Sequence, residues 1–263
     1  MANQANRFSF YAGRLLEWAG DSIYRPKNFF TKFLTQMQTK LGRRFRESNA
    51  HTRRIDYNYN LLPNPYIAEQ EAQTGSIDDV LAHTGYSVGY PAWNLLYYAL
   101  YASLNFTDQR PPIIIETGTN QGYSTIVMAQ VLHDLKINSK IITVEFDSAT
   151  AEIARQNIEA AGLSEYVDLR VGDAVQFLRD FVATHDHIDF IFLDDDHSYE
   201  HVRREFDIIY KHVVACNGKV YMDNTASGGV GRALRYIRRA YGGNLVEFLN
   251  CSWGPPGNAI WQP

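Results

Sequence analysis

The chain has 263 residues and 45% hydrophobic content, which is enough for one large domain or for one domain with an extension. Its net charge of −4 gives no overall attraction to nucleic acid, and its two cysteines, Cys216 and Cys251, exclude a disulfide framework. No apolar run approaches the length of a membrane span, and the first ten residues lack a secretory core, so we expect a cytoplasmic protein without a membrane partner.

The N-terminal part is basic, whereas the rest of the chain is acidic. Residues 1–54 hold 11 of the 25 Lys and Arg residues but only 3 of the 29 Asp and Glu residues. An apolar stripe at helical spacing lies within this part. Such a basic helix can lie on a membrane, but packing on its own domain or in a homo-oligomer is the expectation here. The stripe consists of Phe29, Phe30, Phe33, Leu34, Met37 and Leu41.

Two domains are predicted: residues 1–84 as a basic helical extension that acts as a lid or in oligomerisation, and residues 85–263 as the main domain. A helix opening at Pro91 carries a buried stripe, and strand and helix signals then alternate. The strands are nearly all apolar, which is typical of a parallel sheet covered by helices on both faces. The pattern predicts a doubly wound, mostly parallel, seven-stranded α/β sheet with an N-terminal helical extension.

The expected strands span 112–116, 140–145, 167–171, 188–194 and 218–223, and the expected helices span 124–135, 148–161, 174–184, 199–212 and 229–241. The helix from Pro91 should bury Trp93, Leu96, Leu100 and Leu104. Two further strands, 245–250 and 258–262, suit a hairpin at a sheet edge. The segment between these two strands is rich in glycine and proline.

A glycine loop, ETGTNQGYST at 116–125, joins the first strand to a helix. Gly118 and Gly122 allow a sharp turn and a close approach to a ligand, and the helix start offers free N–H groups. The spacing differs from the G-x-G-x-x-G of dinucleotide folds. The carboxylate of Glu116 would repel a pyrophosphate but attract an ammonium group, which points to S-adenosylmethionine. A purely structural turn is the alternative.

Acidic residues follow almost every predicted strand, where α/β sheets bind ligands. Glu145 is predicted to accept both ribose hydroxyls of a nucleoside, the alternative being a favourable charge at the next helix start. Asp173, with Ala174 beside it, is predicted to meet the adenine amino group, the alternative being an N-cap. The full set of strand-end acids is Glu116, Glu145, Asp173, Asp194 and Asp223.

The ends of strands four and five carry the sharpest pattern, FLDDDHSY and VYMDNTA. Asp194, Asp223 and Asn224 are predicted to converge as oxygen ligands of a hard divalent cation such as Mg²⁺. His197 is predicted to act as the general base. Asp195 and Asp196 are expected to be solvated or capping. The alternative is that His197 and His201 bind Zn²⁺ or iron with an acid.

These motifs, in this order, resemble class I S-adenosylmethionine-dependent methyltransferases over residues 85–263. ETGTNQGYS is similar to the E-x-G-x-x-x-G-Y-S loop of catechol and caffeoyl-CoA O-methyltransferases, and YMDNTA is similar to their D-N-T element. FLDDDHSYEHV resembles a bacterial tailoring branch related to cephalosporin hydroxylases and sugar O-methyltransferases. Catechol-type members have a catalytic lysine three residues after the first metal aspartate, and this chain has His197 there.

The resemblance implies a cofactor site and a metal site in the same domain. It places Glu116, Gly118 and Ser124 around the methionine end of the cofactor, with Thr119 and Gly122 in the same loop. It also implies the ribose role of Glu145 and the metal roles of Asp194, Asp223 and Asn224, with Asp194 touching the cofactor as well. TGYSVGYPAW resembles the segment that closes over the cofactor. Ser87 and Tyr90 are therefore predicted to touch it.

The sequence thus predicts a cation-dependent O-methyltransferase that uses S-adenosyl-L-methionine and Mg²⁺, or another hard divalent cation, on a hydroxyl of a small molecule. A sugar, a polyketide or a phenol fits equally, and Trp253 and Trp261 are candidate walls of the acceptor pocket. One alternative is a nucleic-acid methyltransferase that uses the basic arm. Others are a non-catalytic cofactor-binding scaffold and a nicotinamide-dependent dehydrogenase.

Overall fold

A computed structural model describes residues 64–72, 92–104, 110–248 and 257–263. The predictions for the N-terminal apolar stripe, Ser87, Tyr90, Cys251 and Trp253 lie outside these residues. None of the helices within the described ranges is both long enough and apolar enough to cross a membrane.

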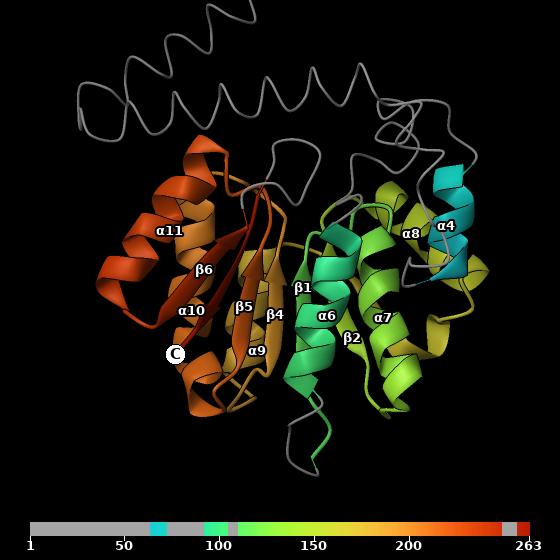
Figure 1. Cartoon of the computed structure of the whole chain (residues 1–263), viewed down its shortest axis with the longest axis horizontal. Coiled ribbons are helices and arrows are strands. Elements are labelled where there is room, and N and C mark those ends of the chain that lie inside the picture. The colour runs from blue at the N-terminus through green and yellow to red at the C-terminus, as the bar shows by residue number, and fades with distance from the viewer. Residues whose placement is uncertain (1–63, 73–91, 105–109, 249–256) are drawn as a thin grey trace, which may run out of the picture. The chain divides into compact units, whose positions relative to one another are not determined.

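The described core is built on a seven-stranded sheet in the order β3-β2-β1-β4-β5-β7-β6 (Figure 1). Strands β1 to β5 pair in parallel, and β7 pairs antiparallel to both β5 and β6. The predicted mostly parallel sheet is therefore confirmed. The strands are β1 (Ile114–Thr117), β2 (Ile141–Glu145), β3 (Val167–Val171), β4 (Phe190–Leu193), β5 (Lys219–Met222), β6 (Asn244–Phe248) and β7 (Asn258–Gln262).

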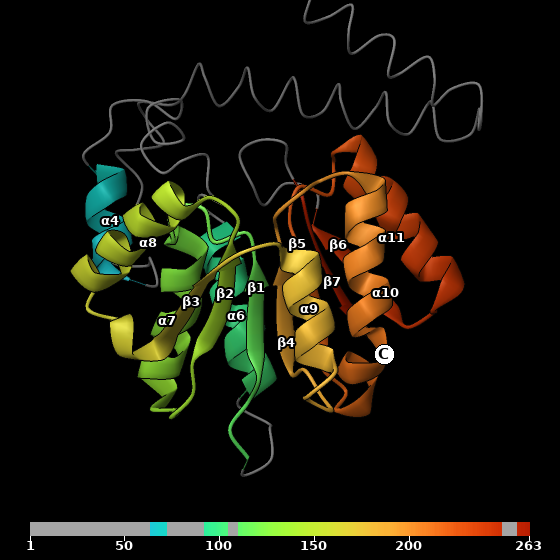
Figure 2. The ribbon, with the colours of Figure 1, turned by 180° about the vertical axis from the view of Figure 1, so that it is seen from behind.

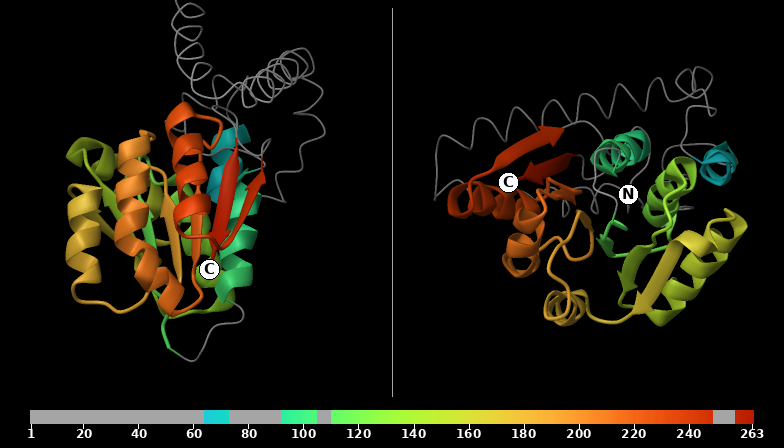
Figure 3. Two further views of the ribbon diagram at one scale, coloured as in Figure 1. Left: turned by 90° about the vertical axis from the view of Figure 1, so that its left-hand side faces the viewer. Right: turned by 90° about the horizontal axis from the view of Figure 1, so that it is seen from below.

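Two helical layers cover the sheet, one on each face (Figures 2 and 3). On one side lie α6 (Ala92–Leu104), α7 (Tyr123–Leu135) and α8 (Ser148–Ala160); on the other lie α9 (Ala174–Val182), α10 (Tyr199–Ala215) and α11 (Gly228–Ala240). A short 3-10 turn, Ser164–Tyr166, precedes β3. All six helices match predicted ones to within a few residues.

The alternating direction of side chains along each strand explains why helices cover both faces of the sheet. Ile114 and Phe190 belong to the apolar cluster formed with α6, α7 and α8, whereas the next residues along, Ile115 and Ile191, belong to the cluster formed with α9, α10 and α11. Successive strand side chains point to opposite faces, so an uninterrupted apolar strand needs a helix on each side. The predicted α6 stripe of Trp93, Leu96, Leu100 and Leu104 is buried in the first cluster.

A further helix, α4 (Pro65–Ala72), packs against the first helical layer (Figure 1). Its Ile67 is fully buried in the same cluster as Trp93 and Tyr123, and Tyr66 donates a hydrogen bond to Asn157 of α8 at 2.8 Å. This helix lies within the range predicted as an extension, yet it contributes to the core. The boundary at residue 84 lies outside the described residues and stays a prediction.

The C-terminal strands form the predicted hairpin at the sheet edge, and β7 is the strand that pairs with β5. Trp261 of β7 is fully buried against Phe206 and Tyr210 of α10, and its indole N–H donates to the carbonyl of Gly242. The expectation that Trp261 lines an acceptor pocket is therefore wrong. Its large side chain fills the core between the hairpin and α10.

The strand order reverses between β1 and β4, because β2 and β3 lie on one side of β1 and β5 lies beyond β4. The connections leaving β1 and β4 therefore diverge to opposite faces of the sheet. Ligands of open α/β sheets bind at the carboxyl ends of the strands beside such a reversal. The fold thus places the predicted site residues around one crevice.

Candidate active site

A cavity of ≈ 700 Å³ lies at the carboxyl ends of the parallel strands. Its walls come from the segments that follow β1, β2, β3, β4 and β5, so residues far apart in the sequence share one space. The lining residues are Gly118, Asn120, Ser124, Val144, Glu145, Phe146, Thr150, Gly172, Asp173, Ala174, Asp194, Asp195, Asp196, His197, His201 and Asn224.

The glycine loop after β1 reaches the cavity with its backbone. Gly118 and Gly122 have φ of +85° and +84°, in the left-handed region that glycine adopts without strain. A Cβ on Gly118 would stand 2.4 Å from the carbonyl oxygen of Asp194, so the loop and the β4 end touch through backbone alone. Gly122 caps α7 without a side-chain hydrogen bond, which leaves N–H groups of the first turn available.

Glu116 has a different environment from the one predicted. Its side chain is fully buried, and its two oxygens accept hydrogen bonds from Ser124 at 2.6 Å, Thr143 at 2.7 Å and Thr125. Burial raises the pKa of this carboxyl to about 7, and the three hydroxyl donors oppose the rise. A direct contact with an ammonium group is not supported by this geometry, because Glu116 lies behind the described cavity wall.

Two other loop residues also sit behind that wall. Thr119 is buried, and its hydroxyl lies 2.5 Å from that of Thr143, which donates to Glu116. Gly122 packs against Ala154 of α8. Of the predicted loop residues, only Gly118 and Ser124 line the cavity. The rest fix the shape of the loop that presents them.

Glu145, at the end of β2, does line the cavity. Its oxygens accept backbone N–H groups of Asn120 at 2.8 Å and Asp147 at 3.0 Å, which ties the first two strand ends together. Each carboxylate oxygen keeps a further lone pair for a ligand hydroxyl. The next residue, Phe146, is 79% exposed and forms part of the same wall. Sequence reasoning missed Phe146, although an aromatic residue directly after a strand-end acid is a readable signal.

Asp173 was predicted either to meet a ligand amino group or to cap a helix, and its position allows both. It is the N-cap of α9, accepting the Gln176 N–H at 2.7 Å, and it lines the cavity beside Ala174. The cap occupies one oxygen and leaves the other available.

Asp194, His197 and Asn224 also line the cavity, and their side chains meet one another. The His197 Nε2 lies 3.3 Å from Asp194 Oδ1 and 3.0 Å from Asn224 Nδ2, and Asn224 Nδ2 lies 3.2 Å from Asp194 Oδ1. Asn224 has a φ of +56°, a conformation uncommon outside glycine and frequent at functional sites. That turn directs its amide back toward the end of β4.

Asp223 stands one residue earlier, buried behind this group. Its Oδ1 accepts a 2.5 Å hydrogen bond from Asn258 Nδ2 at the start of β7. Burial and the charge of Asp194 raise its pKa well above the ordinary value. Burial likewise raises the pKa of Asp194, while His197 opposes that rise. A buried carboxylate whose pKa is raised by a neighbouring carboxylate is an arrangement that a cation relieves.

The histidines separate into two groups. The hydrogen bond to Asp194 raises the pKa of His197, whose side chain is 42% exposed. His201 instead pairs with Asp195 at 2.6 Å, and that contact raises its pKa. The expectation that Asp195 is solvated or capping is wrong, whereas Asp196 accepts the Ser198 N–H in the turn before α10. His197 precedes α10, so it does not share a helix face with His201.

Residues 115–225, from β1 to just past β5, match a family model described as "Methyltransferase domain". A catechol O-methyltransferase from Niastella koreensis is 42% identical over 84 residues, covering 32% of this chain and 37% of the relative. A transmembrane O-methyltransferase homolog from Rattus norvegicus is 30% identical over 135 residues, covering 50% of each. The resemblance to class I methyltransferases is confirmed. The matched stretches span half or less of these relatives' length.

Solved structures agree on the fold of the described core. An O-methyltransferase from Bacillus cereus, described as in complex with SAH, superposes with a TM-score of 0.59 at 22% identity, over 76% of this chain and 90% of the other. A putative caffeoyl-CoA O-methyltransferase from Staphylococcus aureus gives 0.55 at 20% identity, over 74% and 96%. The chain therefore has the Rossmann-like methyltransferase fold.

Proposed function

We propose that the protein is an S-adenosylmethionine-dependent O-methyltransferase that acts on a hydroxyl group of a small molecule with the help of a hard divalent cation. One observation carries the proposal. A single cavity is lined by Gly118, Glu145 and Asp173 and also by Asp194 and His197. A cofactor bound against the first three residues therefore shares one space with the acid–base groups. The relatives are described as O-methyltransferases, which supports the same reaction.

The wall that contains Gly118, Glu145 and Asp173 suits a nucleoside with a positively charged amino-acid part. Glu145 offers lone pairs to ribose hydroxyls, Phe146 offers an exposed ring for stacking, and Asp173 offers an acceptor for an amino group. Gly118 allows the backbone to approach closely, and Ser124, oriented by Glu116, lines the same wall. S-adenosylmethionine supplies an activated methyl group when it is bound there. Ser87 and Tyr90 remain predicted contacts.

The oxygen donors near His197 fit a hard cation. Asp194, Asp223 and Asn224 come from the ends of adjacent strands, and the charge of Asp194 is close enough to raise the pKa of the buried Asp223, which favours a cation among them. These residues would hold Mg²⁺ or a similar ion, which would supply positive charge to stabilise an acceptor oxygen. Asn258 fixes the orientation of the Asp223 carboxylate.

His197 is the proposed general base. Its Nε2 faces Asp194 and Asn224, so a proton taken up there is stabilised by the Asp194 carboxylate. The 42% exposure of the side chain leaves room for an acceptor beside it. The residue must be neutral to act, and the protein otherwise contributes orientation of the two reactants.

The acceptor class stays open among sugars, polyketides and phenols, which would place the protein in natural product biosynthesis. A cytoplasmic location, a homo-oligomer and an N-terminal lid are further parts of the proposal. The basic residues 1–54 keep nucleic acid as a rival acceptor, although the rest of the chain is acidic.

Calorimetric titration of the full chain with S-adenosylmethionine and with NAD⁺, in Mg²⁺ and in EDTA, tests the proposal. We expect selective binding of S-adenosylmethionine, and at least about 10-fold weaker binding in Glu145→Ala, because lost ribose contacts are worth about 1.4 kcal/mol or more. Asp194→Ala should keep cofactor binding but abolish Mg²⁺-dependent product formation on a panel of phenols and sugars. Asp168→Asn, an exposed acid on β3, is the matched control.

Binding of NAD⁺ instead of S-adenosylmethionine would refute the cofactor assignment. Full turnover in Asp194→Ala would refute the role of the cation. Cofactor binding without methylation of any panel member, but with methylation of RNA or DNA, would favour the nucleic-acid rival.

A further inference from the structure

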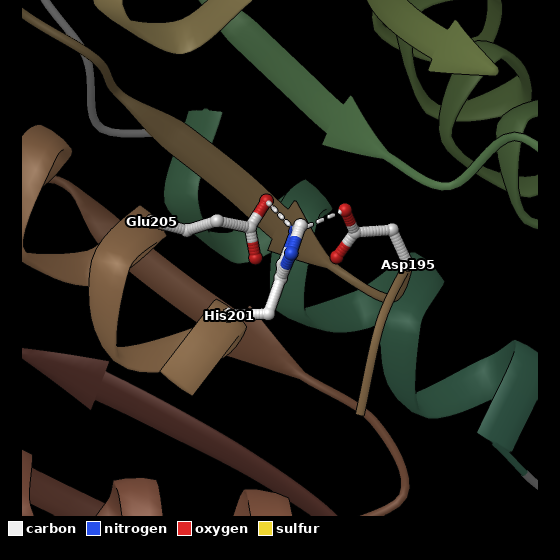
Figure 4. A group of neighbouring side chains, drawn as sticks. All are labelled: Asp195, His201 and Glu205. Carbon is white, nitrogen blue, oxygen red and sulfur yellow. Dashed lines mark hydrogen bonds and ion pairs between the residues drawn. The ribbon is translucent and has the colours of Figure 1, made fainter. Parts of the chain in front are cut away.

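A second group of metal-ligating side chains lies beside the proposed active site. Asp195 follows β4, and His201 and Glu205 stand one turn apart on α10. Figure 4 shows the three side chains pointing toward one another. The His201 Nε2 is 2.6 Å from Asp195 Oδ2 and 3.8 Å from Glu205 Oε1, and all three ligand atoms lie within 4.8 Å of one another.

Glu205 provides an independent sign that this group binds a ligand. Its side chain is 0% exposed, and within the described part of the chain neither of its oxygens has a hydrogen-bond partner. Asp195 Oδ1 is also buried, and it too has no hydrogen-bond partner among the described residues. Buried carboxylate oxygens without donors are strongly unfavourable, so a native fold rarely keeps three of them around one imidazole.

A divalent cation and bound protons compete to neutralise this group. With two carboxylates and a neutral imidazole, the group carries a charge of about −2, which one divalent cation cancels. Burial and the charge of Asp195 raise the pKa of Glu205 well above its ordinary value, while the Thr117 hydroxyl opposes the rise, so a proton on Glu205 takes the place of the cation in the metal-free protein. The second ring nitrogen of His201 lies 3.8 Å from Asp196 Oδ2, and a carboxylate on that side favours the tautomer with Nε2 free to bind a metal.

We propose that Asp195, His201 and Glu205 bind a divalent transition-metal ion, with Zn²⁺ as the representative ion. One imidazole and two carboxylates suit such ions, whereas the oxygen-only set of Asp194, Asp223 and Asn224 suits Mg²⁺. Tetrahedral Zn²⁺ separates its ligand atoms by about 3.4 Å, as follows from bonds of about 2.1 Å. The His201 contacts of 2.6 and 3.8 Å reach that value through side-chain movements below 1 Å. The ion displaces the proton that His201 shares with Asp195.

The cavity gives this site an entrance. Asp195 and His201 line it, while Glu205 lies buried behind them. The ion would link α10 to the segment that also carries Asp194 and His197, so it would hold that segment in place. The site does not depend on the methyltransferase proposal, because its donors are separate residues.

Zn²⁺ titration of the EDTA-treated full chain tests the site, by calorimetry and by the rise of the unfolding temperature. Glu205→Gln keeps the shape of the side chain but removes its charge, and we expect at least about 100-fold weaker Zn²⁺ binding, beyond the loss typical of an outer-shell change. Glu200→Gln, an exposed acid in the first turn of the same helix, is the matched control and should bind as the original protein does. Asp223→Asn should weaken Mg²⁺ binding and keep the Zn²⁺ site.

If Glu205→Gln folds poorly, His201→Gln supplies the second variant, and the visible absorption of bound Co²⁺ reports imidazole ligation directly. Zn²⁺ affinity unchanged in Glu205→Gln, or lost only in Asp223→Asn, would overturn the proposal. So would an original protein that binds no Zn²⁺, since Glu205 would then be carrying a proton.

Discussion

Two glycines of the loop at 116–125 and one reference glycine after α8, all with left-handed backbone conformations, provide a graded test of how the loop is built. Gly162, Gly122 and Gly118 have φ of +73°, +84° and +85°, so an alanine at each suffers a similar dihedral strain. Their surroundings differ. A Cβ meets nothing within 4 Å at Gly162, the Ala154 side chain at 3.2 Å at Gly122, and the Asp194 carbonyl oxygen at 2.4 Å at Gly118.

These contacts give a ranked set of expected losses in the free energy of unfolding. Gly162→Ala should lose about 1 kcal/mol, the strain of the left-handed conformation alone. Gly122→Ala should lose about 2 kcal/mol, because α8 must yield by a few tenths of an ångström. Gly118→Ala should lose about 3–4 kcal/mol, because the clashing atom belongs to the backbone of Asp194 and cannot move aside as a side chain can. The hydrogen bond from the Asp194 N–H to the Thr117 carbonyl, at 3.1 Å, also holds that backbone in place.

Urea unfolding followed by circular dichroism measures the three losses, and calorimetry measures binding of S-adenosylmethionine. Gly162→Ala should bind the cofactor as the original protein does, whereas Gly118→Ala should bind at least about 10-fold more weakly, because the clash moves the Gly118 backbone that lines the cavity. A loss in Gly118→Ala within about 0.5 kcal/mol of that in Gly162→Ala would refute the reasoning, since the backbone contact would then carry no strain.

Two further predictions concern the buried acids. The folded-state pKa of Glu116 is about 7, above its ordinary 4.5, so the folded protein should lose up to about 3 kcal/mol as pH rises through that window. Glu116→Gln should remove most of this loss in urea titrations between pH 5 and pH 8, and an unchanged pH slope would contradict the burial argument. Asn258→Ala removes the donor to Asp223 and should weaken Mg²⁺ or Mn²⁺ binding about 10-fold or more, with cofactor affinity retained. If Asn258→Ala bound the cation as tightly as the original protein, the hydrogen bond from Asn258 would not be needed to orient the Asp223 carboxylate.

The sequence by itself determined the layered fold and the place of the site. Runs such as Ile113-Ile114-Ile115 and Phe190-Ile191-Phe192 cannot face water on either side, so they predict buried parallel strands covered by helices. The polar residues that stop these runs then lie at one edge, which is why Asp194 and Asn224 were predicted to meet and do lie together.

Only the tertiary structure decided which polar groups are partners. Glu116 was predicted to be open to a ligand, but Thr143, from the neighbouring strand, shares its buried space. The contacts of Asp223 with Asn258 and of Asp195 with His201 likewise join separate elements of the fold. Hydrogen bonds depend on distance and direction in space, and the order of β7 beside β5, or the rotation of α10, is not encoded in any local pattern. The site's location therefore followed from chain periodicity, and its electrostatics followed from packing.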